Sequence, residues 1–218
     1  MLYKYIERTA SVLKHLSKAI LTALFLSFIF TQIFFNTQCE DIPNHVIRLH
    51  ILANSDSEQD QSLKIKLRDY ILYNSRSLFE KAENKREAEH IVTTNLDKIL
   101  KNAQGYVNSL GYDYKVSGKL EDNVYFSTRR YESFTLPAGN YTALRITIGK
   151  GQGHNWWCVM FPPLCFSAAE KHDGKQLSDV LSEDEYNITQ NSEQYEYKFK
   201  IAEIYNDIKN FIKSHSSR

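Results

Sequence analysis

Apolar and polar side chains alternate along several short stretches of the chain. In His45 to Leu52, isoleucine and leucine fall on one side and Arg48 and His50 on the other, which is the two-residue period of a strand. Trp156 to Phe161 is apolar almost throughout, as in a strand covered on both faces. Alternation predicts two more strands, at Tyr112 to Ser117 and Tyr141 to Ile148, and a further strand is predicted at Val124 to Arg130.

Turn residues bound the last two strands along the chain. Pro137 to Asn140 precedes the strand at Tyr141, and three glycines between residues 149 and 153 end it. Pro162 and Pro163 end the next strand, because proline has no N–H to donate to a neighbouring strand. We therefore predict that these two strands form a β-hairpin at the centre of a small sheet.

A period of three to four residues predicts three helices. The first two cover residues 59–80 and 86–110; capping residues at Ala53 to Ser57 precede the first, and Gly111 follows the second. The third covers Ile201 to Lys213, with an apolar stripe predicted to face inward, formed by Ile204, Ile208, Phe211 and Ile212.

The segment between the last strand and the last helix is polar. Residues 167–194 are rich in serine and charged residues, which predicts a surface loop or linker. The alternation of Tyr195, Tyr197 and Phe199 predicts a short edge strand after it.

These elements predict an α+β fold. Strands and helices do not alternate regularly, so a doubly wound parallel sheet is not expected. We predict an antiparallel sheet of about four to six strands, with the helices at 59–80 and 86–110 packed on one face and a further helix at the C-terminus.

The N-terminal segment is long and apolar enough to cross a membrane. Ala19 to Cys39 has 21 residues without a formal charge, and as a helix it would span roughly 31 Å. Lys14 and Lys18 precede it, so the positive-inside rule places the N-terminus in the cytoplasm. No Ala-x-Ala cleavage site follows. We predict a signal peptide or membrane anchor at residues 1–40 and an extracytoplasmic domain at residues 41–218.

Charge argues against one class of partner. The chain has a formal net charge of +1, but residues 1–39 hold four basic residues and one acidic residue, which leaves the remainder at −2. A slightly acidic body lacks the basic face that sequence-independent nucleic-acid binding needs.

Motifs for cofactors and metals are weak. Gly149, Gly151 and Gly153 have the wrong spacing for a dinucleotide-binding turn and precede a predicted strand, so a hairpin loop is the favoured interpretation. His45 and His50 are five positions apart on one predicted strand, and an odd offset places them on opposite faces. We predict neither a cofactor nor a metal site.

The cysteines have two interpretations. Cys158 with His154 as a base would make a nucleophilic pair, but thiols oxidise outside the membrane. Cys165 lies seven residues after Cys158, beyond a Pro-Pro bend, so we favour a Cys158–Cys165 disulfide with Cys39 left alone.

Ser55, Asp56 and Asp60 could suggest an acid–base site. Capping of the following helix explains these residues more simply.

Two long blocks carry a family resemblance. The segment GNYTALRITIG (139–149), followed by NWWCVMFPPLCF (155–166), resembles a signature of the stage II sporulation protein R family. HVIRLHILANSDSEQDQSLKIKLRDYIL (45–72) is similar to the other signature of that family. The resemblance implies a sporulation signal exported into the space between the forespore and mother-cell membranes. It implies as partner a membrane-embedded aspartic protease that matures the sigma-E precursor, and it implies no enzymatic activity in the chain itself.

Loop residues next to strand ends are candidate contacts for such a partner. In the first block they are Asn54, Ser55 and Asp56, and in the second His154, Asn155, Trp156 and Trp157. Capping is the alternative role of the first group. The two tryptophans should point to opposite faces of a strand, one into the core and the other under a helix or toward a partner. Arg48, Arg68 and Arg145 are expected to be ion-paired or solvated.

Two other classes of function are considered. An extracytoplasmic hydrolase of cell wall or peptide would use groups around Asn54, Asp56 and His154. An anchored structural module of a cell-surface complex would use none of them.

Overall fold

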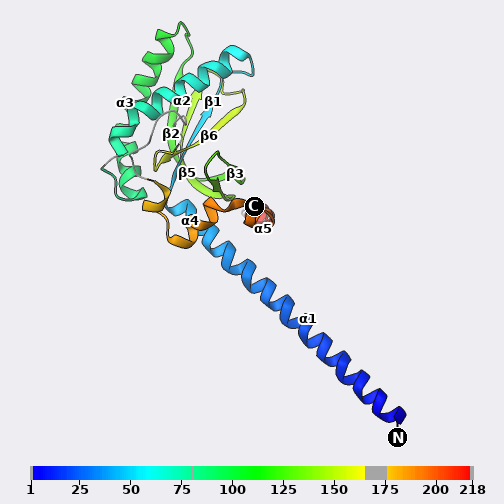
Figure 1. The fold of residues 1–218 in the computed structure, drawn as a ribbon. Coiled ribbons are helices and arrows are strands. Elements are labelled where there is room, and N and C mark those ends of the chain that lie inside the picture. Colours follow the sequence, from blue (N-terminus) through cyan, green and yellow to red (C-terminus); the bar gives the residue numbers. More distant parts are fainter. Residues whose placement is uncertain (1, 80, 165–175, 217–218) are drawn as a thin grey trace. The chain divides into compact units, whose positions relative to one another are not determined.

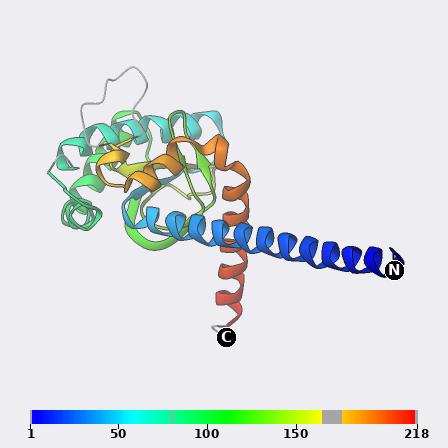
Figure 2. The same ribbon diagram turned by 60° about the horizontal axis from the view of Figure 1, so that its bottom comes forward.

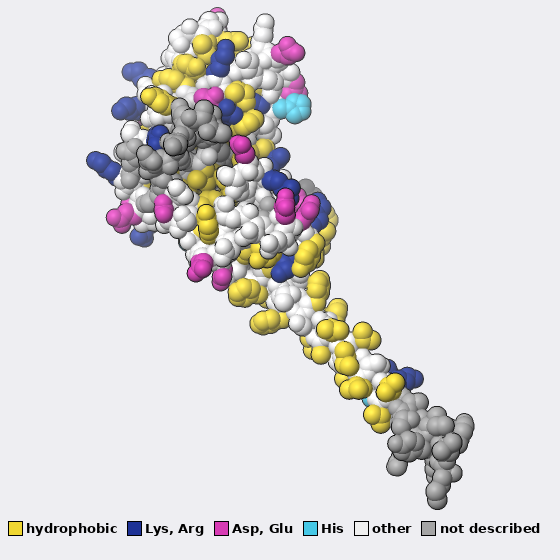
Figure 3. Space-filling model, in the orientation of Figure 1, with side chains coloured by type: hydrophobic (Ala, Val, Ile, Leu, Met, Phe, Trp, Pro, Cys, Tyr) yellow, Lys and Arg dark blue, Asp and Glu magenta, His cyan; other side chains and the backbone are white. Residues whose placement is uncertain are grey.

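The computed structural model describes residues 2–79, 81–164 and 176–216, which form two compact units (Figure 1). The first unit ends at Gln38 and the second begins at Cys39. All but the last three residues of helix α1 (Leu2–Asp41) belong to the first unit, and a candidate membrane span at Val12–Asn44 begins within this helix. Figure 3 shows hydrophobic side chains along α1. The predicted N-terminal apolar helix is confirmed.

The second unit contains a four-stranded sheet with the order β2-β5-β1-β6. Strand β1 pairs in parallel with β5, while β2–β5 and β1–β6 are antiparallel. The sheet is therefore mixed, and the prediction of a purely antiparallel sheet is wrong. The four strands are β1 (Ile47–Leu52), β2 (Val116–Phe126), β5 (Gly139–Ile148) and β6 (Asn155–Phe161).

The predicted central hairpin is also wrong, because β1 lies between β5 and β6. All six residues of β1 are buried. A strand buried on both faces is most stable with a neighbour at each edge, so β1 occupies the interior of the sheet. The loop at residues 149–154 crosses over the end of β1 rather than forming a tight hairpin turn.

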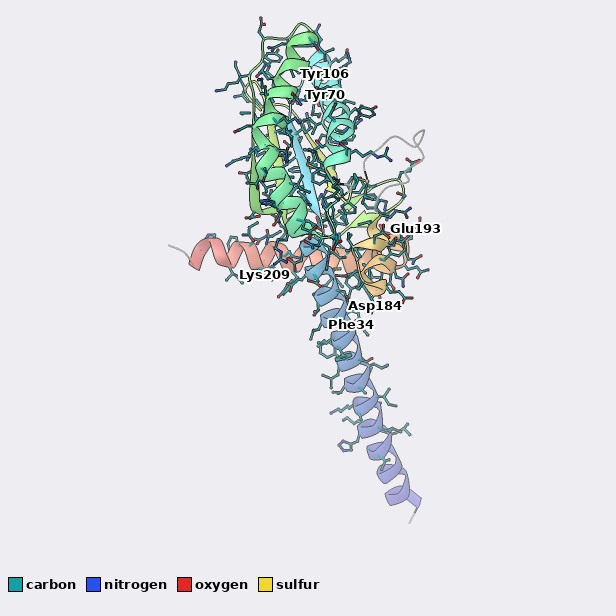
Figure 4. The ribbon with its side chains drawn as sticks, turned by 90° about the vertical axis from the view of Figure 1, so that its left-hand side faces the viewer. Phe34, Tyr70, Tyr106, Asp184, Glu193 and Lys209 are labelled. Atoms are coloured by element: carbon teal, nitrogen blue, oxygen red, sulfur yellow. The ribbon has the colours of Figure 1, made fainter. Side chains whose placement is uncertain are left out.

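Helices α2 (Glu58–Phe79) and α3 (Lys85–Ser109) confirm the two predicted helices, and each end lies within one residue of its predicted position. The side chain of Asn84 caps α3 by accepting a hydrogen bond from the Glu87 amide, and Gly111 follows with a φ of 84°. Tyr70 of α2 and Tyr106 of α3 stack with ring centroids 4.2 Å apart (Figure 4). Both helices share a core with one face of the sheet.

The opposite face of the sheet is covered by short elements. They are η1 (Ile42–Asn44), η2 (Leu177–Asp179) and a small hairpin of β3 (Arg129–Arg130) and β4 (Thr135–Leu136).

Strand β2 runs continuously from Val116, with an irregularity between Glu121 and Val124, where two separate strands were predicted.

The C-terminal segment differs from its prediction. Part of the predicted loop at 167–194 lies outside the described residues, but α4 (Glu183–Gln190) and η3 (Ser192–Tyr195) fold within the rest. Ser182 and Glu185 form a reciprocal capping box that starts α4. Helix α5 (Glu196–Ser216) follows, so no edge strand forms at Tyr195, Tyr197 and Phe199.

Helix α5 confirms the last predicted helix but not its orientation (Figure 2). Phe199, Ala202 and Asn206 are its buried residues. The stripe predicted to face inward is exposed by 52% to 64%, and it consists of Ile204, Ile208, Phe211 and Ile212.

Candidate functional site

Two loops meet at one end of the sheet. Because β1 is parallel to β5 and antiparallel to β6, the chain leaving β1 emerges beside the connection from β5 to β6. The Gly153 amide donates a hydrogen bond to the Ala53 carbonyl at 2.9 Å, and the Lys150 amide donates to Asn54 Oδ1 at 3.0 Å. We call residues 53–57 and 149–155 the loop edge. It brings together the two groups of candidate contact residues.

Close packing fixes the two loops against each other. A Cβ atom added at Gly153 would lie 2.2 Å from the Ser55 carbonyl oxygen. Gly149 has a φ of 57°, and a Cβ there would meet the Asn54 side chain. The glycines at these positions are therefore explained by backbone approach, not by phosphate binding.

Asp56 and His154 form an exposed pair across the loop edge. The Asp56 carboxylate accepts hydrogen bonds from the His154 amide and contacts His154 Nδ1. Both side chains are mostly exposed, at 54% and 81%. The hydrogen bond from the His154 backbone, followed by the contact with its ring, lowers the pKa of Asp56 below its usual value.

The other residues of the first loop have structural roles. The buried Asp60 carboxylate accepts hydrogen bonds from Ser55 Oγ and Asn54 Nδ2. Burial raises the pKa of Asp60, but these hydrogen bonds outweigh burial and lower it overall. The Asp60 amide donates to Ser57 Oγ at 3.2 Å, so the predicted capping at the start of α2 is confirmed.

Lys64 of α2 ties the helix to the second loop, and the sequence analysis missed it. Its side chain is only 3% exposed, and its Nζ atom donates to the His154 carbonyl at 2.9 Å and to Gln61 Oε1. Burial lowers the pKa of the Lys64 ammonium group. In the sequence Lys64 is a charged residue beside the apolar positions of the helix, and no local signal marks its carbonyl partner.

The two tryptophans of β6 lie on opposite faces of the sheet, as predicted. Trp156 packs against the core shared with α2 and α3, and the Arg68 guanidinium lies 4.5 Å from its ring centroid. Trp157 packs on the other face, where its ring stacks on that of His50 with the ring centroids 3.7 Å apart. Asn155 Oδ1 is 3.1 Å from His50 Nε2. Both rings are half-buried.

A groove of about 800 Å³ lies beside this edge strand. It is lined from α2, α3, β6 and the β3–β4 connection, and seven of its fifteen lining residues are aromatic. Its lining residues include Arg68, Tyr70, Tyr106, Tyr131, Phe134, Trp156 and Trp157. The tryptophans thus connect the loop edge to an aromatic groove.

Two comparisons with known proteins point to one family. The profile of the family described as stage II sporulation protein R matches residues 43–171, more than half of the chain and the whole of the loop edge. The chain belongs to the stage II sporulation protein R family. Stage II sporulation protein R of Bacillus subtilis strain 168 is 34% identical over 186 residues, which are 77% of this chain and 83% of that protein. No solved structure matches the chain.

A buried arginine joins strands of this family domain. Arg48 is fully buried, and it donates from Nε to the Cys158 carbonyl at 3.1 Å and from Nη2 to the Tyr131 hydroxyl at 2.7 Å. Its guanidinium also lies 4.3 Å from the centroid of the Phe126 ring. The expectation that Arg48 is ion-paired or solvated is wrong, whereas Arg68 and Arg145 do form ion pairs, with Asp69 and Glu121.

Neither of the two cysteines that the structure describes, Cys39 and Cys158, is an accessible nucleophile. Cys158 is fully buried on β6, whereas His154 is exposed in the loop edge. Cys165 lies outside the described residues, so the Cys158–Cys165 disulfide stays a prediction. Cys39 is a buried free thiol.

One group of side chains has the composition of a metal site. Ligand atoms of Asp41, His45 and Glu185 lie within 4.8 Å of one another. His45 Nε2 is 3.5 Å from Asp41 Oδ2 and 3.7 Å from Glu185 Oε1, so direct contacts among the three side chains account for the cluster.

Proposed function

We propose that this chain is an exported sporulation signal that activates a membrane-embedded aspartic protease of the mother cell by contact. Maturation of the sigma-E precursor follows. The observation that carries the proposal is the meeting of two distant family blocks at one exposed loop edge. In the described loop edge, Asp56 and His154 form an exposed acid–base pair, while the neighbouring hydroxyls of Ser55 and Ser57 bond to each other and to Asp60 at the start of α2. The arrangement suits recognition better than chemistry.

The N-terminal helix supports export. Lys14 and Lys18 precede an uncharged run that α1 presents as a continuous helix, and the family domain follows it. With the cationic end in the cytoplasm, the domain lies on the far side of the membrane. A contact signal must be in that compartment to meet the exposed part of a protease in the opposing membrane.

Activation by contact requires only differential affinity. A signal that prefers the active state of its partner by roughly 3 kcal/mol shifts the ratio of active to inactive states about 150-fold. Such a preference is within reach of a few well-held aromatic and polar contacts.

The candidate contact surface has a rigid base and an exposed rim. Asp56, His154 and Asn155 are exposed on the loop edge, while Trp156 and Trp157 line the aromatic groove beside it. Lys64 and Asp60 hold the loops from beneath. We propose that the protease contacts the rim and inserts apolar side chains into the groove.

The experiment is reconstitution in non-sporulating cells that carry the protease and the sigma-E precursor. Precursor cleavage, followed by gel mobility, should appear when the full chain is expressed. It should disappear when residues 1–39 are deleted and return when another export signal replaces them. Cleavage without export, or in cells that lack the protease, would contradict the proposal.

A further inference from the structure

Helix α5 packs one face against the domain and leaves an apolar stripe exposed on another. Phe199, Ala202 and Asn206 are buried on the inner side. On the outer side Ile204 and Ile208 are 52% and 54% exposed, and Ile212 is 59% exposed. Residues four apart lie on the same face of a helix, so the isoleucines form a continuous outer stripe.

An exposed stripe of isoleucine is unusual for a surface surrounded by water. Isolated apolar residues are common on surfaces, but a contiguous stripe marks contact with another apolar phase. Tyr205, 46% exposed, extends the outer stripe. Lys200 and Lys209 flank it, and lysine side chains can place apolar stems in an interface while their charges stay in water.

Contacts within the second unit fix α5 to the end of the N-terminal helix. Lys209 Nζ donates to Glu40 Oε1 at 2.7 Å (Lys209 is labelled in Figure 4). Asp207 accepts a hydrogen bond from the Tyr125 hydroxyl at 2.6 Å. Glu40 is the first charged residue after the uncharged run at residues 19–39. Where that run crosses a bilayer, Glu40 lies at the membrane surface, and so does the helix bound to it.

We infer that the outer stripe of α5 lies in the interface of the phospholipid bilayer that α1 enters. The helix lies along the membrane surface, with its isoleucines at the boundary between headgroups and acyl chains and its lysines toward water. The inference rests on retention of α1 as an anchor. It is independent of the proposed activation of a protease.

Photocrosslinking of the full chain in phosphatidylglycerol–phosphatidylethanolamine vesicles tests the inference. A photoreactive phenylalanine analogue is placed at Ile208, and in a control protein at Tyr73 of α2, which is 68% exposed. Tyr73 lies one turn after Tyr70, which Figure 4 shows far from Lys209. Burial of one isoleucine-sized side chain predicts about tenfold more lipid adduct at position 208 than at position 73.

Either of two results would overturn the inference. Crosslinks between two chains at position 208 would show that a second copy covers the stripe, and equal lipid adducts at positions 208 and 73 would show that α5 does not contact lipid. A second protein carries the analogue at Tyr205 together with Ile204→Ser, Ile208→Ser and Ile212→Ser. Its lipid adducts should fall about tenfold relative to the same analogue without the serine substitutions.

Discussion

The amide of Gly153 donates a hydrogen bond to the carbonyl of Ala53, 100 residues earlier in the chain, at 2.9 Å. This bond joins the two family blocks at the loop edge. The close approach leaves no room for a side chain at position 153, because the Ser55 carbonyl oxygen occupies the place of a Cβ atom.

Gly153→Ala should therefore separate the two loops. We expect a loss of about 1–3 kcal/mol in the free energy of unfolding, because the backbone of Ser55 must move. Gly105→Ala is the matched control, since Gly105 lies inside α3 with nothing within 4 Å of an added Cβ. Urea denaturation should show Gly105→Ala as neutral or stabilising by up to about 1 kcal/mol. Equal stability of both variants would contradict the packing argument.

Lys64→Met should loosen the second loop while leaving the helix intact. Methionine keeps the apolar stem but removes the bond from Nζ to the His154 carbonyl. We expect a loss of about 1–3 kcal/mol in stability and faster amide exchange at residues 150–154. Lys66→Met, at an exposed position of the same helix, is the control. Hydrogen exchange that is unchanged in Lys64→Met would show that the contact does not hold the loop.

The helices were predictable from sequence because their signals are local. Amphipathic periodicity and the caps at Asn84 and Gly111 act within one or two turns. The sheet was not predictable in the same way, because β1 pairs with β5 residues about 95 positions away. No local sequence pattern indicates whether the neighbour of an interior strand is parallel or antiparallel.

The candidate site was predictable in parts. Asn54 to Asp56 and His154 to Trp157 were identified as two separate loops, but only the position of β1 between β5 and β6 brings them together. Lys64 was missed because its partner is a backbone carbonyl 90 residues away. In α5, periodicity identified an apolar stripe but could not tell which of two faces packs inward.

His50 should make stability depend on pH. Burial, only partly offset by the bond to Asn155, lowers the pKa of His50 below its usual value of about 6.5. The unfolded chain then binds a proton more readily than the folded chain, so stability falls as pH decreases below about 6.5 and is fully present above it. The melting temperature of His50→Gln should vary less over this range than that of the unsubstituted protein. His90→Gln, at an exposed site on α3, is the matched control substitution.

The Cys158–Cys165 disulfide is testable by mass spectrometry of exported protein. In a Cys39→Ser background, which leaves only these two cysteines, the peptide containing them should gain two hydrogens on reduction. The chain-entropy estimate predicts a contribution of about 2.5 kcal/mol for so short a loop. Alkylation of both thiols without prior reduction would refute the disulfide.

Asp56→Ala and His154→Ala distinguish contact from chemistry. If these side chains bind the protease, each substitution should weaken activation by roughly 1 kcal/mol, about fivefold, and higher expression of the variant should restore precursor cleavage. If the pair performs acid–base catalysis, each substitution should lower the maximal rate by about 10²- to 10⁴-fold at any expression level. Asp184→Ala, at an exposed position on α4, is the control (Figure 4). The measurement is precursor cleavage against the amount of exported variant. Rescue at high expression is expected, because Asp56 and His154 are exposed and the neighbouring Ser55 and Ser57 hydroxyls are engaged with each other and with Asp60.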